Sequence, residues 1–315
     1  MVGVASSVAI YKALELTRLF KKQGAEVHVF MTAHATELVS PQLFQAISGN
    51  PVHHQMFDRS GNDPMPHLQV MKEADAVVLA PATASLIGRY ATGLADDLLT
   101  TALLATRAPV LVAPAMNEAM YLHPIVQENL ERLRGSGVSI IEPIEGELAC
   151  GVYAVGHLAS LEAILLRTEQ LMVPQSFKGK KFLITSGRTV ESLDPVRCLT
   201  NFSSGKMGLA LVREALLRGA TVMLVSGRAD VDYVLHENLE IDYVKTAEEM
   251  RIAVLDEFEN CDYYISAAAI CDFAPRKVSE VKLKKSGSRV LELVENPDIL
   301  SEVARMKASH QVVIG

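Results

Sequence analysis

"ADAVVLAPAT" (Ala74–Thr83) and "RAPVLVAPAM" (Arg107–Met116) are apolar runs of strand length, typical of strands buried on both faces of a sheet. Between them, "DDLLTTALLAT" (Asp96–Thr106) has the composition of a helix that begins with acidic residues. This alternation of strands and helices indicates a parallel, doubly wound α/β sheet. Ligands bind such sheets beyond the carboxyl ends of the strands. The end of the second run, "PAMN" (Pro114–Asn117), is therefore a candidate site.

The chain before this core follows the same alternation. "VGVASS" (Val2–Ser7) predicts a strand that leaves through a turn of small residues. "VAIYKALELTRLFKKQG" (Val8–Gly24) predicts a helix that ends at Gly24, with Ile10, Leu14 and Thr17 on one face. "AEVHVFMT" then supplies the next strand.

A second segment of the same kind begins after the stretch "MVPQSFKGKK" (Met172–Lys181), where Pro, Gly and charged residues interrupt the apolar pattern. "GKKFLITSGRT" predicts a strand and turn, "GLALVREALLRGATVMLVSG" a helix, a stop at Gly219 and a strand, and "DYYISAAAICDF" and "QVVIG" further strands. We therefore expect two Rossmann-like domains, over residues 1–172 and 178–315. "AICDF" ends a strand and is a second candidate site on this geometry.

Composition limits the class of protein. A length of 315 residues predicts two domains of about 150 residues each. Apolar residues make up 49% of the chain and the mean hydropathy is +0.20, so large cores can be buried. No apolar run approaches the roughly 18 residues that a membrane span needs, and the start "MVGVASSVAIYK" lacks the basic leader of a signal peptide. We therefore expect no membrane partner.

Charge and cysteine content narrow the partners and the compartment. A formal net charge of −7 without a dense basic stripe predicts no nucleic-acid partner, whereas small anionic ligands need only local groups. The four cysteines form neither a CxxC pair nor a metal-ligand spacing; they are Cys150, Cys198, Cys261 and Cys271. Free thiols in a reducing cytoplasm are the simplest interpretation.

Small and hydroxyl residues follow three of the predicted strands. "GVASS" (Gly3–Ser7) would let backbone N–H groups approach a phosphate at a helix N-terminus, although a plain tight turn explains it equally well. It is not a GxGxxG motif, so a dinucleotide is not indicated. Thr32 and "ATAS" (Ala82–Ser85) could complete a mononucleotide site.

Two side chains are candidates for proton transfer. His67 lies in the Pro-bracketed stretch "NDPMPHLQV"; a lone His is more often a surface or satisfied residue, but it is the default acid or base if it faces a ligand. Cys150 lies in the Gly-rich segment "GELACGVYAVGHL". An isolated Cys is most often a buried structural thiol, but such a segment is a poor place to bury one, which favours a reactive role.

Five motifs occur in the order found in the flavin-dependent cysteine decarboxylases: "VASSVAIYK", "APATASL", "ATGLADDLLTTALLAT", "PAMNEAM" and "LACG". Residues 1–172 resemble the decarboxylase half of the bifunctional phosphopantothenoylcysteine decarboxylase / phosphopantothenate–cysteine ligases of coenzyme A biosynthesis. The resemblance implies a flavoprotein-type domain with FMN as its cofactor. The residues expected to bind FMN are Gly3, Ser6, Ser7, Thr32, Thr83, Ala84, Ser85, Ala115 and Met116.

The resemblance also implies roles for three catalytic residues. Asn117 binds the substrate carboxylate, and an amide would hold it without a full counter-charge until it leaves as CO₂. His67 corresponds to the family's His, and Cys150 to the Cys of a mobile substrate clamp. The implied chemistry oxidises the cysteinyl side chain on FMN to a thioaldehyde, which is the electron sink for loss of CO₂. Reduced flavin then returns the electrons to the enethiol, with Cys150 as proton donor.

Several positions depart from the family pattern. Ser6 and Ser7 stand where relatives often have Gly-Gly, and "TASL" stands where many have "SANT". His157 takes the place of the Arg that commonly ends the clamp. If that Arg holds the substrate phosphate, His157 is expected to alter substrate affinity or clamp closure. The chain also begins later and ends earlier than the family pattern, so we expect it to be shortened at both ends.

"TVESLDPVRCLTNFSSGKMG" (Thr189–Gly208) resembles the ligase half of the same family. Its "SSGK" precedes a helix and offers hydroxyls, amides and a cation to a phosphate, although it lacks the Walker A pattern and a Ser-capped helix start would look similar. The resemblance implies that Asn201 takes part in the ligation, on an acyl-nucleotide intermediate. It also singles out Lys282 in "KLKK" as a nucleotide and transition-state contact, where the alternative is a solvated loop.

The implied reaction activates 4′-phosphopantothenate with CTP and Mg²⁺, after which cysteine displaces CMP. Asp272 at a strand end would meet the nucleotide or its metal; no metal ligands can be assigned. The expected nucleotide-binding residues are Ser266, Ala267, Ala268, Asp272, Lys282, Pro297, Asp298, Ile299 and Leu300. The product of the two reactions together is 4′-phosphopantetheine, made from 4′-phosphopantothenate through 4′-phosphopantothenoylcysteine.

Two alternatives to a two-activity enzyme stay open: an active decarboxylase joined to an inactive ligase domain, and a non-catalytic FMN-binding regulatory protein. The joint presence of His67, Asn117 and Cys150 argues against the second alternative. The resemblance further implies a homo-oligomer built from trimers of the flavin domain, with flavin sites at subunit contacts, and dimers of the ligase domain.

Overall fold

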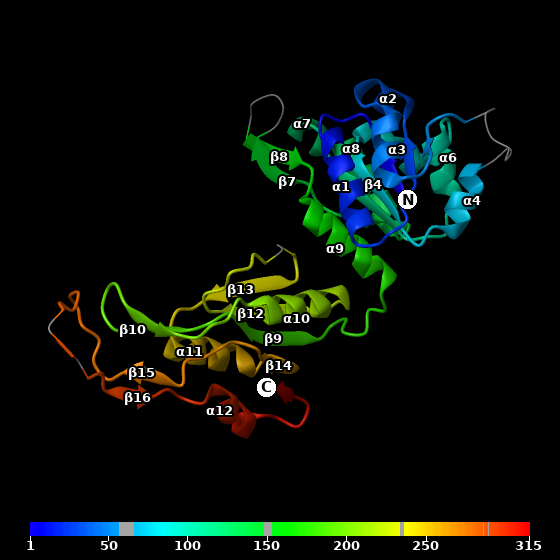
Figure 1. Cartoon of the computed structure of the whole chain (residues 1–315). Helices are drawn as coiled ribbons and strands as arrows, with labels where there is room; N and C mark the ends of the chain where they lie inside the picture. Colours follow the sequence, from blue (N-terminus) through cyan, green and yellow to red (C-terminus); the bar gives the residue numbers. More distant parts are fainter. Residues whose placement is uncertain (57–65, 148–152, 234–235, 286, 289) are drawn as a thin grey trace. The chain divides into compact units, whose positions relative to one another are not determined.

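A computed structural model describes residues 1–56, 66–147, 153–233, 236–285, 287–288 and 290–315. The chain forms two compact units, Met1–Met172 and Val173–Gly315 (Figure 1). Each contains a parallel sheet flanked by helices, which confirms the expected doubly wound α/β class. Among the helices of the described residues, none is long and apolar enough to cross a membrane.

The N-terminal unit is built on a six-stranded sheet in the order β3-β2-β1-β4-β5-β6, with every neighbouring pair parallel. The strands are β1 (Val2–Val4), β2 (Val29–Met31), β3 (Val52–His53), β4 (Val77–Ala82), β5 (Val110–Pro114) and β6 (Ser139–Ile140). The strand order reverses between β1 and β4, where Val2 pairs with Val78. The carboxyl edge at this reversal is the expected place for a ligand.

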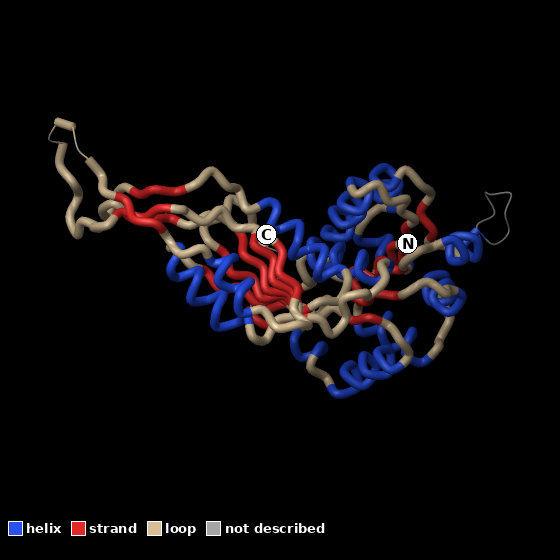
Figure 2. The backbone as a smooth tube through the Cα atoms, turned by 90° about the horizontal axis from the view of Figure 1, so that it is seen from below, coloured by secondary structure: helices blue, strands red, loops and turns tan. Residues whose placement is uncertain are grey.

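Helices cover both faces of this sheet (Figures 1 and 2). They are α1 (Ile10–Lys22), α2 (Ala33–Leu38), α3 (Pro41–Ser48), α4 (Pro66–Glu73), α5 (Ala84–Thr92), α6 (Leu98–Ala105), α7 (Glu118–Tyr121), α8 (Pro124–Gly135) and α9 (Leu161–Met172). One core cluster joins the sheet to α1, α3 and α9 through residues such as Leu16, Phe44 and Ile164. A second joins the sheet to α4, α5, α6 and α8 through Met71, Leu99 and Leu130.

Helix α1 confirms the pattern read from the sequence. Ile10 and Thr17 are buried and Leu14 is half-buried, so the expected face does point to the core. Lys21 and Lys22 occupy the last turn, where cations favour the helix dipole, and Gly24 follows in the left-handed region with φ of +85°. An antiparallel hairpin, β7 (Ile144–Glu147) and β8 (Tyr153–His157), precedes α9.

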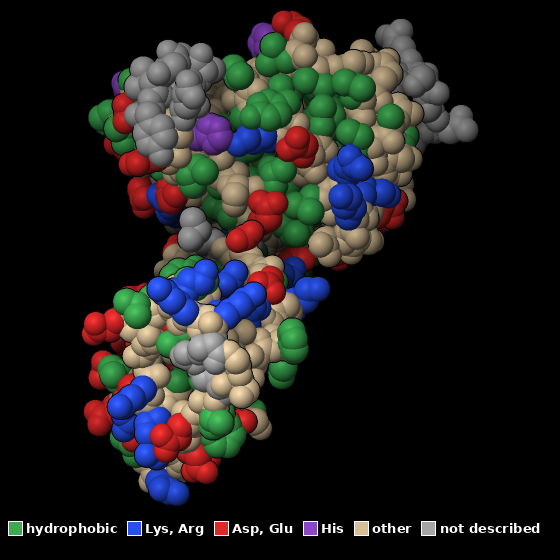
Figure 3. All heavy atoms as spheres, turned by 60° about the vertical axis from the view of Figure 1, so that its left-hand side comes forward, with side chains coloured by type: hydrophobic (Ala, Val, Ile, Leu, Met, Phe, Trp, Pro, Cys, Tyr) green, Lys and Arg blue, Asp and Glu red, His purple; other side chains and the backbone are tan. Residues whose placement is uncertain are grey.

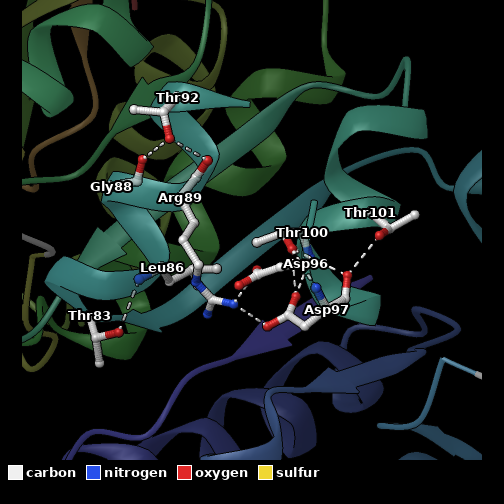
Figure 4. Close-up of polar contacts among 9 residues, drawn as sticks. All are labelled: Thr83, Leu86, Gly88, Arg89, Thr92, Asp96, Asp97, Thr100 and Thr101. Atoms are coloured by element: carbon white, nitrogen blue, oxygen red, sulfur yellow. Dashed lines mark hydrogen bonds and ion pairs between the residues drawn. The ribbon is translucent and has the colours of Figure 1, made fainter. Parts of the chain in front are cut away.

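The predicted acidic start of α6 is a complete capping box (Figure 4). The Asp97 carboxylate accepts hydrogen bonds from the N–H and the hydroxyl of Thr100, both at 2.7 Å. Arg89 of α5 forms ion pairs with Asp97 at 2.5 Å and with Asp96 at 3.0 Å. Burial alone would raise the pKa of Asp97, but the bonds from Thr100 and Arg89 hold it below its ordinary value. The corner between α5 and α6 is therefore fixed by charge as well as by packing.

The C-terminal unit has a five-stranded parallel sheet in the order β13-β12-β9-β14-β17. Its strands are β9 (Lys181–Ser186), β12 (Thr221–Ser226), β13 (Leu239–Tyr243), β14 (Tyr263–Ser266) and β17 (Val312–Ile314), and its helices are α10 (Lys206–Leu217), α11 (Ala247–Phe258) and α12 (Ile299–Met306). Core residues of α11 and α12 pack with Leu183, Val225 and Tyr264 of the sheet. The order reverses between β9 and β14, so the carboxyl ends of these strands mark the expected ligand position.

Two antiparallel hairpins extend from the carboxyl edge of this sheet (Figures 1 and 2). One pairs β10 (Val190–Ser192) with β11 (Cys198–Thr200), and the other pairs β15 (Phe273–Pro275) with β16 (Leu293–Glu295). Strand β10 lies against β15. The loop 193–197 joins β10 to β11, and the loop 276–292, which contains Lys282, joins β15 to β16.

Candidate active sites

The carboxyl edge of the N-terminal sheet brings together loops that are far apart in sequence. Ser6 and Ser7 follow β1, Thr83 follows β4, and Ala115 follows β5. The Ser7 hydroxyl donates to the Ala115 carbonyl at 3.3 Å, which joins the β1 and β5 loops directly. The expected flavin-binding residues of these three loops therefore share one edge.

Two threonines of this edge cap helices. The Thr32 hydroxyl accepts the Ala35 N–H of α2 at 3.3 Å. The Thr83 hydroxyl accepts the Leu86 N–H of α5 at 3.4 Å, as Figure 4 shows. Ala84 and Ser85 form the first turn of α5, where backbone N–H groups have no partner within the helix. These donors at a helix N-terminus suit an anionic group.

Gly3 is placed by packing. It lies inside β1 rather than in the turn, and a Cβ there would come within 2.5 Å of Leu79 Cδ2 and 2.9 Å of Leu99 Cδ1. The missing side chain therefore lets two core leucines close over the strand. A contact of Gly3 with the cofactor stays a prediction.

Asn117 is exposed and oriented. It is the N-cap of α7, and its Oδ1 accepts the Ala119 N–H at 2.9 Å. This bond assigns the amide orientation, and it leaves the two N–H donors of Nδ2 outside the cap. Nδ2 has no hydrogen-bond partner among the described residues. Asn117 thus combines a structural cap with a donor that is available to a ligand.

Strand β8 is docked on the Asn117 loop. The Met116 N–H donates to the Gly156 carbonyl at 3.1 Å. Gly156 has φ of +135°, and a Cβ on it would lie 2.1 Å from the Met116 carbonyl oxygen. Cys150 belongs to the connection between β7 and β8 and lies outside the described residues. The hairpin whose connection carries Cys150 is therefore attached to the loop that carries Asn117.

We expect Gly156→Ala to separate these two loops, because its Cβ cannot coexist with the Met116 carbonyl oxygen. The kcat/KM of the decarboxylase reaction that the resemblance implies should fall by about tenfold or more, since small displacements of catalytic groups have large costs. The matched control is Gly88→Ala in α5, where a Cβ would meet only the Asn129 amide at 3.6 Å. Equal activities of the two variants in a CO₂-release assay would contradict the docking role of Gly156.

His157, at the position where the resemblance expects Arg, has a basic neighbour. Lys12 Nζ, in the first turn of α1, lies 3.4 Å from each ring nitrogen of His157. Burial lowers the pKa of Lys12 from its ordinary value, although Glu15 acts in the opposite direction. Although His157 replaces the expected Arg, Lys12 therefore supplies a basic side chain beside this position of β8.

His67 lies in the first turn of α4, and its side chain lies outside the described residues. Helix α4 leads into β4 at the amino edge, so its first turn is directed toward the carboxyl edge. Figure 1 shows α4 and the β7–β8 hairpin at opposite flanks of the N-terminal unit. Within one chain, helix α4, whose first turn contains His67, is therefore apart from the hairpin docked on the Asn117 loop.

A cavity of about 680 Å³ lies at the other edge of this sheet. Met1, His28, Pro51 and Asp75, which precede or begin strands, are among its lining residues. It is separate from the carboxyl edge, where the predicted site residues of this unit lie.

The carboxyl edge of the C-terminal sheet also collects predicted site residues. The Thr185 hydroxyl of β9 accepts the N–H groups of Ala267 and Ala268, at 3.2 and 3.4 Å. Asn201 Nδ2 donates to the Ile270 carbonyl at 2.9 Å. These bonds bring Asn201 and the segment after β14 together.

The "NPDIL" segment joins the same place. Asn296 Nδ2 donates to the Cys271 carbonyl at 2.7 Å, and its N–H to the Asp272 carbonyl at 2.8 Å. Asp298, two residues later, caps α12 by accepting the Ser301 N–H at 2.9 Å. The Asp298 carboxylate thus has a structural role, and nucleotide binding by this segment stays a prediction.

The "SSGK" loop is held by contacts that the sequence did not indicate. Gly205 is the N-cap of α10 with φ of +78°, and a Cβ on Gly208 would lie 2.0 Å from Ser186 Oγ, so α10 approaches β9 closely. Arg188 forms two hydrogen bonds with the Asp230 carboxylate, at 2.8 and 3.0 Å, and donates to the Ser203 carbonyl. No local pattern signals this pair, because 42 residues separate its members.

Lys282 lies in a different part of the C-terminal unit from Asn201. It is exposed in the loop 276–292, and its neighbour Leu283 is bound at the Asp194 turn between β10 and β11. Asn201 follows the opposite end of β11. The length of β11 therefore separates the backbone anchor of Lys282 from Asn201.

Comparison with known proteins matches the two parts of the chain to two separate family models. Residues 1–172 match the family model described as Flavoprotein, and residues 177–315 match the DNA/pantothenate metabolism flavoprotein C-terminal domain. A solved structure described as the FMN-dependent cysteine decarboxylase SpaF is similar at 30% identity and a TM-score of 0.47, covering 53% of this chain and 92% of that one.

Curated relatives match along the whole chain. The coenzyme A biosynthesis bifunctional protein CoaBC of Vibrio vulnificus (strain YJ016) is 41% identical over 319 residues, covering 100% of this chain and 79% of the relative. The CoaBC protein of Bacillus subtilis (strain 168) is 42% identical over 316 residues, covering 99% and 77%. With both family models matched and these relatives covered over more than three quarters of their length, the chain belongs to the family of bifunctional coenzyme A biosynthesis proteins.

Proposed function

We propose that the chain makes 4′-phosphopantetheine in two reactions. Residues 178–315 join 4′-phosphopantothenate to cysteine at the expense of CTP, and residues 1–172 decarboxylate the resulting 4′-phosphopantothenoylcysteine with FMN. The observation that carries the decarboxylase assignment is Asn117, whose amide donors are available beside the docked β8 in a domain of the Flavoprotein family.

The residues of the carboxyl edge fit FMN. Ser6 and Ser7 are small and half-buried, and the first turn of α5 presents N–H donors that suit the flavin phosphate. Thr83 adds a hydroxyl that already accepts the Leu86 N–H and can donate its own proton. When bound, FMN supplies the two-electron oxidation of the cysteinyl side chain and the return of those electrons.

We infer that Asn117 holds the substrate carboxylate. Neutral amide donors orient the group while leaving its negative charge largely uncompensated, so the carboxylate is not stabilised against loss of CO₂. Cys150 then gives a proton to the enethiol that remains after CO₂ has left. His67 is the second proton-transfer group, because an imidazole changes charge near neutral pH.

In the ligase unit we propose that Asn201 acts on the acyl-cytidylate and that Lys282 contacts the nucleotide and the charge on the transferring phosphate. The expected nucleotide contacts are the segments 266–268 and 297–300 together with Asp272. Mg²⁺ would be held mainly by the CTP phosphates, as is usual for this ion. No cluster of three or more His, Cys, Asp or Glu side chains that could hold a metal ion occurs among the described residues.

We further propose a homo-oligomer in which trimers of the flavin domain place His67 of one subunit beside Asn117 of another, with ligase domains paired. The opposite positions of α4 and β7–β8 support this arrangement. The N-terminal unit also exposes large apolar side chains such as Leu104, Leu122 and Ile125, and hydrophobic side chains gather on the face shown in Figure 3. The free thiols of the described cysteines support a reducing cytoplasm as the location.

Mixed oligomers test this arrangement. Copies with His67→Asn and copies with Asn117→Asp are each expected to be inactive as decarboxylases. Dissociating and reassociating the two together should restore part of the activity, because some sites then receive both native residues from different subunits. Activity that stays absent in verified mixed oligomers would show that each site is built within a single chain.

The function itself is tested with purified protein and the two substrates. Release of CO₂ from 4′-phosphopantothenoylcysteine supports the decarboxylase, and pyrophosphate formation from CTP with 4′-phosphopantothenate supports the ligase. Bound FMN without CO₂ release would favour a regulatory FMN-binding protein. CO₂ release without pyrophosphate formation would favour a decarboxylase joined to an inactive ligase domain.

A further inference from the structure

We propose that Asp194 is a positioning residue that holds the segment carrying Lys282 in its place for the ligase reaction. This inference rests on the role proposed above for Lys282. Asp194 is a buried carboxylate in the β10–β11 turn, and Leu283, which it contacts in the loop 276–292, is 89 residues away in sequence.

One oxygen of Asp194 closes its own turn. Oδ1 accepts the N–H groups of Val196 and Arg197, each at 2.8 Å. The Leu193 N–H adds a bond to the Arg197 carbonyl at 2.8 Å. The loop 193–197 is thereby a fixed platform at the end of the hairpin.

The other oxygen reaches across to the lysine loop. Oδ2 accepts the Leu283 N–H at 3.1 Å and forms an ion pair with Arg197 Nη2 at 2.8 Å. The same Arg197 nitrogen donates to the Leu283 carbonyl. Leu283 is therefore bound at its N–H by the carboxylate and at its carbonyl by the guanidinium, both from the platform.

The backbone that precedes Lys282 is also held by hydrogen bonds. The Ser279 N–H donates to the Leu193 carbonyl at 3.0 Å, and the Ser279 hydroxyl donates to the Val281 carbonyl at 2.6 Å. Lys282 itself is exposed and forms no ion pair with any residue that the structure describes. The backbone of Lys282 is therefore held in place by its neighbours, while the ammonium group of its flexible side chain is available to bind an external anion.

The charge of Asp194 matters to this arrangement. Its side chain is 0% exposed. Burial alone would raise the pKa of Asp194, but the three backbone N–H groups and Arg197 lower it to about 2. The group is therefore a carboxylate at neutral pH, and each oxygen accepts strong hydrogen bonds.

Asp194→Asn separates the two functions of the carboxylate. An amide oxygen in the Oδ1 place can still accept from Val196 and Arg197, so the turn can persist. The amide nitrogen then faces the Leu283 N–H and Arg197 Nη2, donor against donor. We expect pyrophosphate formation to slow by about tenfold to a hundredfold. We also expect trypsin to cleave the folded chain faster after Lys282, Lys284 or Lys285.

A double-mutant cycle with Lys282→Gln distinguishes positioning from general structural support. If Asp194 acts through Lys282, adding Asp194→Asn to Lys282→Gln should slow the reaction by less than about twofold more. If the two losses multiply, Asp194 acts independently of Lys282 and the proposal is overturned. Full activity of Lys282→Gln alone would instead refute the proposed role of Lys282, and this inference with it.

Two further variants complete the test. Leu283→Pro removes the same N–H donor with Asp194 intact, so even if Asp194→Asn folds poorly it should slow pyrophosphate formation and speed trypsin cleavage after Lys284 or Lys285. Cleavage after Lys282 is not compared in this variant, because trypsin does not cut before proline. Asp262→Asn is the matched control, because Asp262 also accepts a backbone N–H, from Lys181 at 2.9 Å, and pairs with a cation, Lys180 at 3.0 Å, at the opposite edge of the sheet. Loss of ligase activity in Asp262→Asn equal to that in Asp194→Asn would overturn the proposal.

Discussion

Asn117→Asp is expected to lower decarboxylase kcat/KM by about a hundredfold to a thousandfold, the usual cost of removing an active-site donor. Asp caps a helix as well as Asn does, so the bond to the Ala119 N–H and the start of α7 should persist. What is lost is the pair of N–H donors, and a carboxylate then faces the substrate carboxylate.

Asn117→Ser separates the two causes, because Ser keeps the cap without adding charge. It should lose less activity than Asn117→Asp but remain well below the parent protein. FMN content measured after gel filtration should be unchanged in both variants. If Asn117→Asp released CO₂ at the parent rate, the carboxylate-binding role of Asn117 would be wrong.

Cys150→Ser is expected to stop the reaction after CO₂ has left. A serine hydroxyl is a much weaker acid than a thiol, so the proton is delivered to the enethiol slowly, with a loss of about a hundredfold to ten-thousandfold in 4′-phosphopantetheine formation. Mass spectrometry should then find the enethiol in place of 4′-phosphopantetheine.

Cys198→Ser is the matched control, since Cys198 is an exposed free thiol in the C-terminal unit. It should leave the decarboxylase product unchanged. A normal yield of 4′-phosphopantetheine from Cys150→Ser would refute the proton-donor role.

The class of fold and many elements were predictable because the strands are continuous apolar runs and the helices carry clear starts and stops. The apolar runs that end at Thr83 and Met116 contain strands β4 and β5 and the first residues of the loops that follow them. Asp97, one of the acidic residues expected at the start of the next helix, caps α6. These signals are local, so one sequence suffices to find them.

Contacts between distant segments were not predictable. Gly156 looked like one Gly among several in a Gly-rich segment, and only its φ and its approach to Met116 reveal why it lacks a side chain. Asp194 was visible only as part of a motif, and its bond to Leu283 spans 89 residues. A through-space contact leaves no periodic trace in the sequence.

The central claim is that the N-terminal unit binds FMN and uses it to decarboxylate 4′-phosphopantothenoylcysteine. The most direct test is the visible absorption spectrum of the purified protein, supplemented with FMN and freed of excess, followed by addition of that substrate under anaerobic conditions. We expect a bound-flavin spectrum that responds to the substrate, together with CO₂ release. A protein that retains no flavin, or a flavin spectrum that the substrate leaves unchanged with no CO₂ formed, would contradict it.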